Sequence, residues 1–187
     1  LSPLGDTIIA AHQIAISVTS QLFMIPMSLA IALTIRVGTY YGEHNWLAMR
    51  KVQYLGLATG TVFAFITMLF MWLFRAEIVA IYTSDYDVAK VAMYLILFAI
   101  AYQLMDAWQV SAAGCLRGMQ DTKGPMWITM LAYWVIAFPV GIYLARFTEM
   151  GAAGVWVGLI VGLSIACVLL LTRLYMNNQR LSQKSPT

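Results

Sequence analysis

The sequence is poor in charged residues. Only 10% of its 187 residues are Asp, Glu, Lys or Arg, whereas a soluble globular domain carries roughly 25%. Hydrophobic residues make up 61% of the chain, and its mean hydropathy is +0.78. Water solvates such a surface poorly, so the composition excludes an ordinary soluble domain. It indicates instead that lipid is the natural solvent of the chain.

Features typical of enzymes and of nucleic-acid-binding proteins are also missing. Cys115 and Cys167 have no spacing typical of a metal site or a redox pair. The sequence contains no GxSxG, HExxH or GxxxxGK[ST] motif, so we expect neither an enzyme nor a cofactor, and an ion gradient as the energy source. The net charge is only +3, and the basic residues lie between apolar stretches, so nucleic acid is not an expected partner.

Long apolar stretches are what the sequence has in abundance. A helix needs about 20 mainly apolar residues to cross a bilayer. Five stretches meet this requirement and predict an all-α integral membrane fold, with spans at 8–35, 52–74, 88–113, 126–145 and 152–173. The charged segments between them, such as 75–87, are expected to be loops. Pro26 predicts a bend in the first and longest span.

The division of the chain follows from these spans. We expect residues 1–6 to end an upstream helix, 7–176 to form the transmembrane bundle and 177–187 to form a cytoplasmic tail. The chain begins with Leu1 and has no charged region before an apolar core, so it is expected to be a fragment. Eight Lys and Arg residues lie on one side of the predicted spans and three on the other. The positive-inside rule then places the C-terminus in the cytoplasm.

One acidic residue, Asp106, lies deep in an apolar stretch. A charged side chain at the centre of a membrane helix costs at least ~2.5 kcal/mol, and such groups usually face a cavity or a partner. Tyr102 and Gln109 share its helical face. We therefore predict a site for a proton or Na⁺ at Asp106 and Tyr102, with Gln109 beside it. The alternative is a carboxyl group that only joins two helices by hydrogen bonds.

The first predicted span carries its own polar stripe. Its members fall near one helical face and are Gln13, Ser17, Gln21 and Ser28, with His12 beside them. If this face lines the same cavity as Asp106, then Gln13 and Ser17, together with Gln109, would supply neutral hydrogen-bonding groups for a substrate. Polar contacts between helices are the alternative.

The last predicted span has glycines at four-residue spacing. Gly154, Gly158 and Gly162 are continued by Ala166, which leaves one helical face flat. In membranes, small residues allow the backbones of two helices to approach closely. We therefore expect this face to pack tightly against another helix.

Four segments resemble a known family. In chain order they read AAHQIAISVTSQLFMIPMSLAIALTIRVGTYYG, YQLMDAWQVSAAGCLRGMQDTKGP, YWVIAFPVGIYLA and GAAGVWVGLIVGL, and they resemble the C-terminal half of NorM-type multidrug and toxic compound extrusion (MATE) transporters. The resemblance implies a bacterial inner membrane protein with twelve helices in two lobes around a central cavity. It also implies exchange of a cationic or amphiphilic drug for Na⁺ or H⁺. The five spans would then be helices eight to twelve, without the N-terminal lobe and helix seven.

The same resemblance assigns roles to individual residues. By this comparison Asp106 matches the cation-coupling aspartate, Tyr102 the tyrosine one turn earlier that helps to hold the ion, and Gln13 a cavity-lining glutamine. A flippase for lipid-linked substrates is disfavoured because no Lys or Arg lies in a span centre. A scaffold without transport activity is disfavoured because it gains nothing evident from a buried Asp106.

Overall fold

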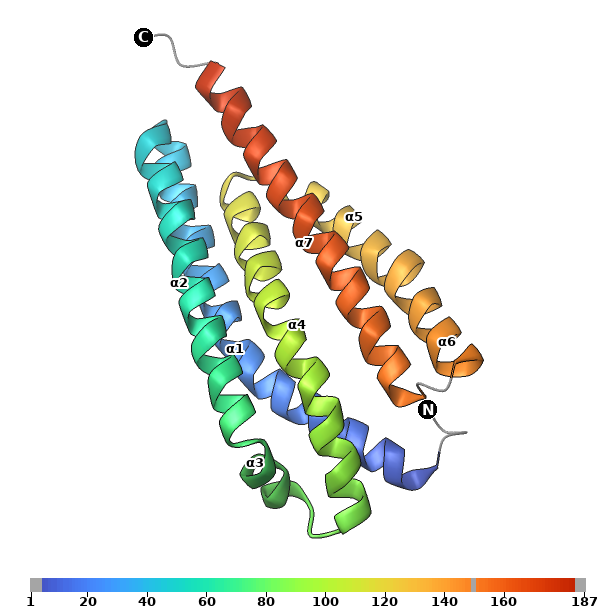
Figure 1. Cartoon of the computed structure of the whole chain (residues 1–187). Coiled ribbons are helices and arrows are strands. Elements are labelled where there is room, and N and C mark those ends of the chain that lie inside the picture. Colours follow the sequence, from blue (N-terminus) through green and yellow to red (C-terminus); the bar gives the residue numbers. More distant parts are fainter. Residues whose placement is uncertain (1–4, 149–150, 184–187) are drawn as a thin grey trace.

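The computed structural model describes residues 5–148 and 151–183, and every regular element within these ranges is a helix (Figure 1). The elements are α1 (Asp6–Gly42), α2 (Trp46–Leu73), α3 (Arg75–Tyr82), α4 (Tyr86–Gly118), α5 (Lys123–Leu131), the π-helical segment η2 (Ala132–Ala137), α6 (Phe138–Phe147) and α7 (Ala152–Gln183). With α5, η2 and α6 counted as one, the described residues contain five helices that are long and apolar enough to cross a membrane. The predicted all-α membrane fold with five spans is confirmed.

The predicted stretches can be compared with these helices. Four of the five lie wholly inside a helix, and the second ends at Phe74, one residue after α2. Residues 1–4 of the predicted upstream segment and 184–187 of the predicted tail lie outside the described residues. The division of the chain into bundle and tail, and its orientation in the membrane, stay predictions.

The expectation of a loop at 75–87 was wrong for its first half, where α3 forms. This short helix buries Val79, which is 1% exposed and belongs to a cluster with Met71 and Val88. Packing against α2 and α4 therefore stabilises a helix that is too short to form by itself.

Helix α4 lies at the centre of the bundle, in contact with α1, α2, α3, α5 and α7. Its closest approach is to α1, because a side chain at Gly114 would collide with the backbone of Ala30. The Thr34 hydroxyl donates to the Gly114 carbonyl oxygen at 3.0 Å. Figure 1 shows α1 changing direction along its length, and the buried Pro26 lies within this helix. Proline removes one backbone hydrogen bond and allows such a bend.

The glycine stripe of α7 packs against η2 and α6. A side chain at Gly158 would meet the backbone of Gly141 and Ala137, and one at Gly162 would meet Ala132 and Ala137. The interpretation of this stripe as a helix-packing face is confirmed. Close backbone approach replaces burial of large side chains as the source of packing here.

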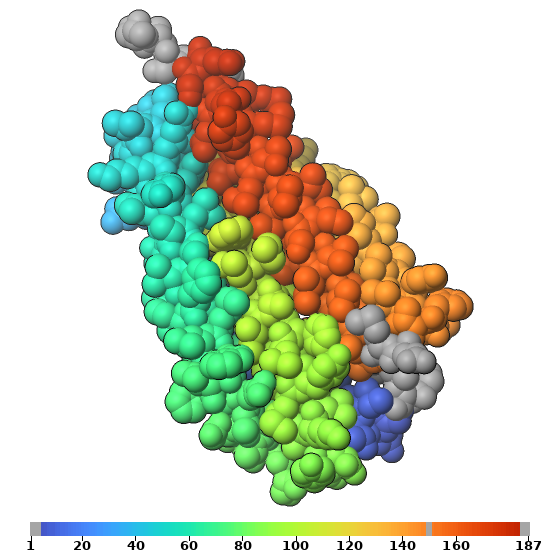
Figure 2. All heavy atoms as spheres, viewed as in Figure 1, coloured from blue at the N-terminus to red at the C-terminus, as the bar shows by residue number. Residues whose placement is uncertain are grey.

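Large apolar side chains point outward over much of the surface. Trp72, Phe65 and Val168, for example, are exposed by 57%, 56% and 62%. Figure 2 shows α2, α4 and α7 forming one broad face of the molecule. Such exposure would promote aggregation in water but suits contact with lipid chains.

The turn between α4 and α5 is tied to α7 by Asp121. Its carboxylate accepts hydrogen bonds from Arg173 at 2.6 and 3.0 Å, from the Asn177 amide at 3.0 Å and from the Gly124 N–H at 3.2 Å. The hydrogen bond from the Arg173 guanidinium is the main reason that the pKa of Asp121 lies below its ordinary value. This contact fixes the position of α5 relative to the C-terminal half of α7.

Replacing Gly158 by Ala tests the close packing of α7 on α6. The added Cβ meets backbone atoms that cannot turn away, so we expect a loss of about 1–3 kcal/mol in unfolding free energy. Gly42→Ala is the matched control, since a Cβ at Gly42 meets nothing within 4 Å. Thermal unfolding in detergent micelles measures both. Equal midpoints for the two variants would contradict the packing described.

Replacing Asp121 by Asn tests the tie between the α4–α5 turn and α7. Because the folded pKa of Asp121 is depressed, its stabilising effect is present above the unfolded value of ~3.9 and is lost as the pH falls through the folded value. The Arg173 side chain is 43% exposed, so we expect Asp121→Asn to cost only about 1 kcal/mol or less at pH 7. The gap to wild type should shrink below about pH 4. A gap that does not change with pH would disprove this account.

Candidate cation and substrate site

The carboxyl group of Asp106 lies inside the bundle, in the middle of α4. Its residue is 3% exposed, and the Tyr102 hydroxyl donates to Oδ1 at 3.2 Å. Across residues 5–148 and 151–183, no Lys, Arg or His forms an ion pair with it, and the ion pair that the structure has joins Arg173 to Asp121. Within the described part of the chain, the hydrogen-bond partner of this carboxyl group is therefore a neutral hydroxyl.

Gln109 extends the polar face of α4 by one turn and meets a residue from another helix. It is 6% exposed, and its Oε1 accepts a hydrogen bond from the Tyr133 hydroxyl at 3.0 Å. The structure thus joins Tyr102 to Asp106 and, on the next turn of α4, Gln109 to Tyr133 of η2.

The π-helical geometry of η2 explains how Tyr133 is positioned. Pro139 lacks an N–H and its ring would clash with the carbonyl group of residue 135 in a regular α-helix. Over Ala132–Ala137 the backbone forms the wider turns of a π-helix, and such segments are frequent at functional sites. Sequence reasoning missed Tyr133, although a phenol inside an apolar span and a proline six residues later were a usable signal.

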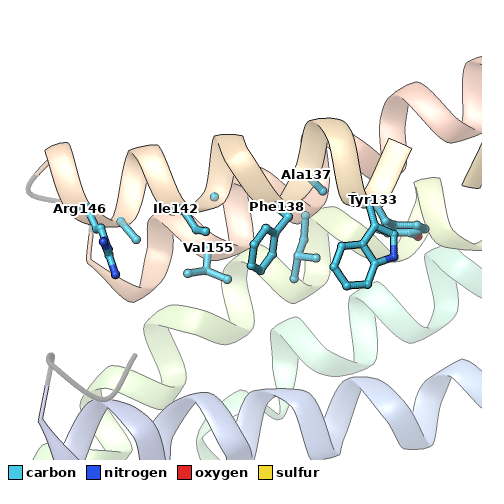
Figure 3. A pocket seen from close by; sticks show the side chains of 10 residues that line it. Tyr133, Ala137, Phe138, Ile142, Arg146 and Val155 are labelled. Carbon is cyan, nitrogen blue, oxygen red and sulfur yellow. The ribbon is translucent and has the colours of Figure 1, made fainter. Parts of the chain in front are cut away.

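A cavity of about 800 Å³ lies beside this cluster, against η2, α6 and α7. Figure 3 shows Tyr133, Phe138, Ile142 and Arg146 projecting from the η2–α6 helix to one side, with Arg146 at the end far from Tyr133. Tyr133 therefore belongs both to the cavity wall and to the polar cluster. An apolar and aromatic wall with a few polar groups suits organic molecules of drug size.

The polar stripe of α1 makes other contacts. Gln13 is exposed, and the Ser17 hydroxyl donates to the backbone oxygen of Gln13 at 2.8 Å. His12 Nδ1 accepts from Trp156 Nε1 at 3.2 Å. In the part of the chain that the structure describes, no hydrogen bond connects Gln13 or Ser17 with Asp106. Their role in lining a substrate cavity stays a prediction.

A second polar face of α4 joins it to α2. The Gln103 amide donates to Thr67 Oγ1 at 3.1 Å, and Trp108 Nε1 donates to Thr61 Oγ1 at 2.8 Å. Gln103 is 4% exposed. These groups satisfy one another between two packed helices, so we assign them a structural role. Gln103 and Trp108 are not separated by three, four or seven residues, so helical periodicity did not predict these contacts.

The donor set at Asp106 limits which cations suit it. No group of three or more His, Cys, Asp or Glu side chains placed to hold a metal ion occurs among the described residues. The carboxylate of Asp106 and the phenol oxygen of Tyr102 are hard oxygen donors. Such donors suit Na⁺ or a proton better than a transition metal, which prefers nitrogen or sulfur.

The MatE family model matches residues 1–143 of the chain. The chain belongs to the MatE family. The probable multidrug resistance protein NorM of Acinetobacter baylyi is 75% identical to this MatE chain over 185 residues, which are 99% of the chain and 41% of that protein. The multidrug resistance protein MdtK of Proteus mirabilis is 42% identical over 94% of the chain and 39% of its own length. The predicted family membership is confirmed.

Solved structures share the fold of this MatE chain. The TM-score is 0.88 with the eukaryotic MATE transporter AtDTX14, at 22% identity over 95% of this chain and 40% of that one. It is 0.89 with a multidrug resistance MATE family transporter of the MOP superfamily in an outward-facing conformation, at 16% identity over 96% of this chain and 40% of that one. The chain spans about 41% of the length of its NorM relative from Acinetobacter baylyi.

Replacing Tyr133 by Phe tests the contact that links η2 to α4 in this MatE chain. The change leaves the buried Gln109 oxygen without its donor, so we expect a loss of about 1–3 kcal/mol in unfolding free energy. Tyr143→Phe is the control, because Tyr143 lies on the same long helix and is 62% exposed. Unfolding in mixed micelles with increasing denaturing detergent compares the two. If both variants lose the same free energy, the Tyr133 contact does not hold the helices together.

Proposed function

We propose that this chain forms part of a multidrug efflux transporter that exchanges a cationic or amphiphilic drug for Na⁺ or H⁺ by alternating access. The observation that most supports this is the Asp106 carboxyl group, which is 3% exposed and is bound by the neutral Tyr102 hydroxyl. A buried carboxylate needs positive charge to be stable. The coupling ion, Na⁺ or H⁺, supplies that charge in one state of the transport cycle. The cationic drug supplies it in another.

The cation binds at Asp106 and Tyr102 in this proposal. The two oxygen atoms lie 3.2 Å apart, so a small cation can contact both after a slight adjustment. A cationic drug and the coupling ion compete for the same negative charge. Loading one therefore weakens binding of the other, and this competition is the coupling free energy between the two.

The drug lies against the aromatic wall beside this site. Tyr133 lines the 800 Å³ cavity and donates a hydrogen bond to Gln109, one turn from Asp106 on α4, so a molecule in the cavity lies close to the acidic group. Aromatic rings such as Trp134 and Phe138 favour flat and cationic molecules. Gln13 and Ser17 add neutral hydrogen-bonding groups from α1. The names of the NorM and MdtK relatives, which are multidrug resistance proteins, support drugs as the cargo.

The transporter is larger than this chain in our proposal. The chain spans 41% of its NorM relative, and the remainder supplies the second lobe and helix seven around the central cavity. By itself the chain moves no drug. Its excess of Lys and Arg at one end of the bundle supports a C-terminus in the cytoplasm. Its relatives in Acinetobacter baylyi and Proteus mirabilis support a bacterial inner membrane.

Replacing Asp106 by Asn in the intact transporter tests this proposal. The variant keeps the shape of the side chain but removes the charge for which ion and drug compete. We expect efflux of a cationic dye from proteoliposomes, driven by a Na⁺ or H⁺ gradient, to fall at least about tenfold. Asp87→Asn is the matched control, since Asp87 lies exposed at the start of the same helix. Equal amounts of each protein in the vesicles are verified first.

The proposal fails if the Asp106→Asn variant exports the dye at the wild-type rate. It also fails if Asp87→Asn reduces efflux as strongly, because the effect would then not depend on the buried position. The 187-residue chain alone, inserted into the same vesicles, is expected to move no dye.

A further inference from the structure

A second cavity, of about 340 Å³, lies between the beginning of α2 and the C-terminal half of α7. We propose that it binds the headgroup of an anionic phospholipid, with phosphatidylglycerol as the best-fitting class. The site is separate from Asp106 and does not depend on the proposed transport activity. Its walls combine one cationic side chain, three amide side chains, two tyrosines and three leucines.

The positive charge comes from Arg50. Its Nη2 donates to the backbone oxygen of Asn178 at 2.6 Å and contacts the Ser182 hydroxyl, while its Nε–H is buried and has no hydrogen-bond partner. Among the residues described, no Asp or Glu forms an ion pair with this guanidinium. A partly buried guanidinium is stabilised by an anion, and phosphate matches its planar fork of donors.

The amide of Asn178 adds an unused acceptor to the same cavity. Its Nδ2 donates to Gln53 Oε1 at 2.7 Å, whereas its Oδ1 is buried without a partner. The cavity therefore has one free donor on Arg50 and one free acceptor on Asn178. A ligand with a phosphate and a neighbouring hydroxyl satisfies both, as the glycerol headgroup of phosphatidylglycerol does. Arg50 and Asn178 both line the cavity.

The cavity crosses the boundary between polar and apolar parts of the bundle. Arg50 lies just before the apolar stretch 52–74, and Asn178 lies after the stretch 152–173. Leu57 and Leu171 continue the wall toward the membrane interior. This arrangement provides a surface for acyl chains below a site for phosphate, which free phosphate would not use.

Two tyrosines line the cavity near this boundary between polar and apolar segments. Tyr54 and Tyr175 line the cavity and are exposed by 74% and 64%. Tyrosine is enriched where membrane proteins meet the headgroup region, because its ring is apolar and its hydroxyl is polar. The exposed Lys51 next to Arg50 adds to the attraction for an anionic lipid.

Native mass spectrometry of the intact, delipidated transporter tests the proposal with dioleoyl phosphatidylglycerol as the probe. We expect one tightly bound lipid per protein and weak binding of dioleoyl phosphatidylcholine. Arg50→Gln removes a charge-assisted hydrogen bond and should lower the affinity roughly tenfold or more. Lys51→Gln is the matched control, because it removes the same charge from the neighbouring exposed position and should cost no more than about fivefold.

Three outcomes would overturn the proposal. Equal weakening by Arg50→Gln and Lys51→Gln would mean diffuse attraction without a site. Equal binding of both lipids would mean that the headgroup charge is not recognised. Binding of glycerol phosphate as tightly as the lipid would mean a site for a soluble phosphate.

A measurement on the wild-type protein covers the case in which Arg50→Gln does not fold. A photoactivatable phosphatidylglycerol should crosslink to peptides that contain residues 50–57 and 171–182. Crosslinks confined to other parts of the protein would overturn the proposal. Because neither measurement uses drug efflux, their failure is distinguishable from failure of the transport assignment.

Discussion

The hydrogen bond between Tyr102 and Asp106 is the interaction on which the proposed cation site depends. Asp106 lies near the middle of α4, where most of the buried side chains are apolar. A carboxyl group in such a position is tolerated only where the protein, a cavity or a bound cation compensates for the lost water. The central position of α4, in contact with five other elements, supplies the protein part of that compensation.

Close approach between helices makes the central position of α4 possible. Gly114 and Gly118 bring its backbone against α1, and Gly158 brings α7 against α6. Within a membrane, apolar side chains gain little by leaving lipid, so tight backbone contact and hydrogen bonds between helices matter more. Polar pairs such as Gln103 with Thr67 then hold the helices in register.

The polar contacts at one end of the bundle have a different character from those in its middle. Asp121 with Arg173, and Arg50 with Asn178, join α7 to the α4–α5 turn and to α2. The middle instead offers the aromatic cavity beside Tyr133 and a single acidic group. Charged contacts therefore hold the helices together at one end of the bundle, and a cavity lies in its middle. Our proposed function requires a binding site within the membrane, and this arrangement provides one.

The sequence by itself determined the features that depend on local periodicity and solvent preference. The five apolar stretches, the shared face of Tyr102, Asp106 and Gln109, and the flat glycine face of α7 follow from helix geometry and from the length of a membrane span. Only the tertiary structure decided which distant groups meet. Tyr133 lies on a π-helical turn that packs against α7 and reaches Gln109 of α4, and Arg50 meets Asn178 across 128 residues of chain. Such contacts depend on how whole helices pack against one another, and helical periodicity carries no information about that packing.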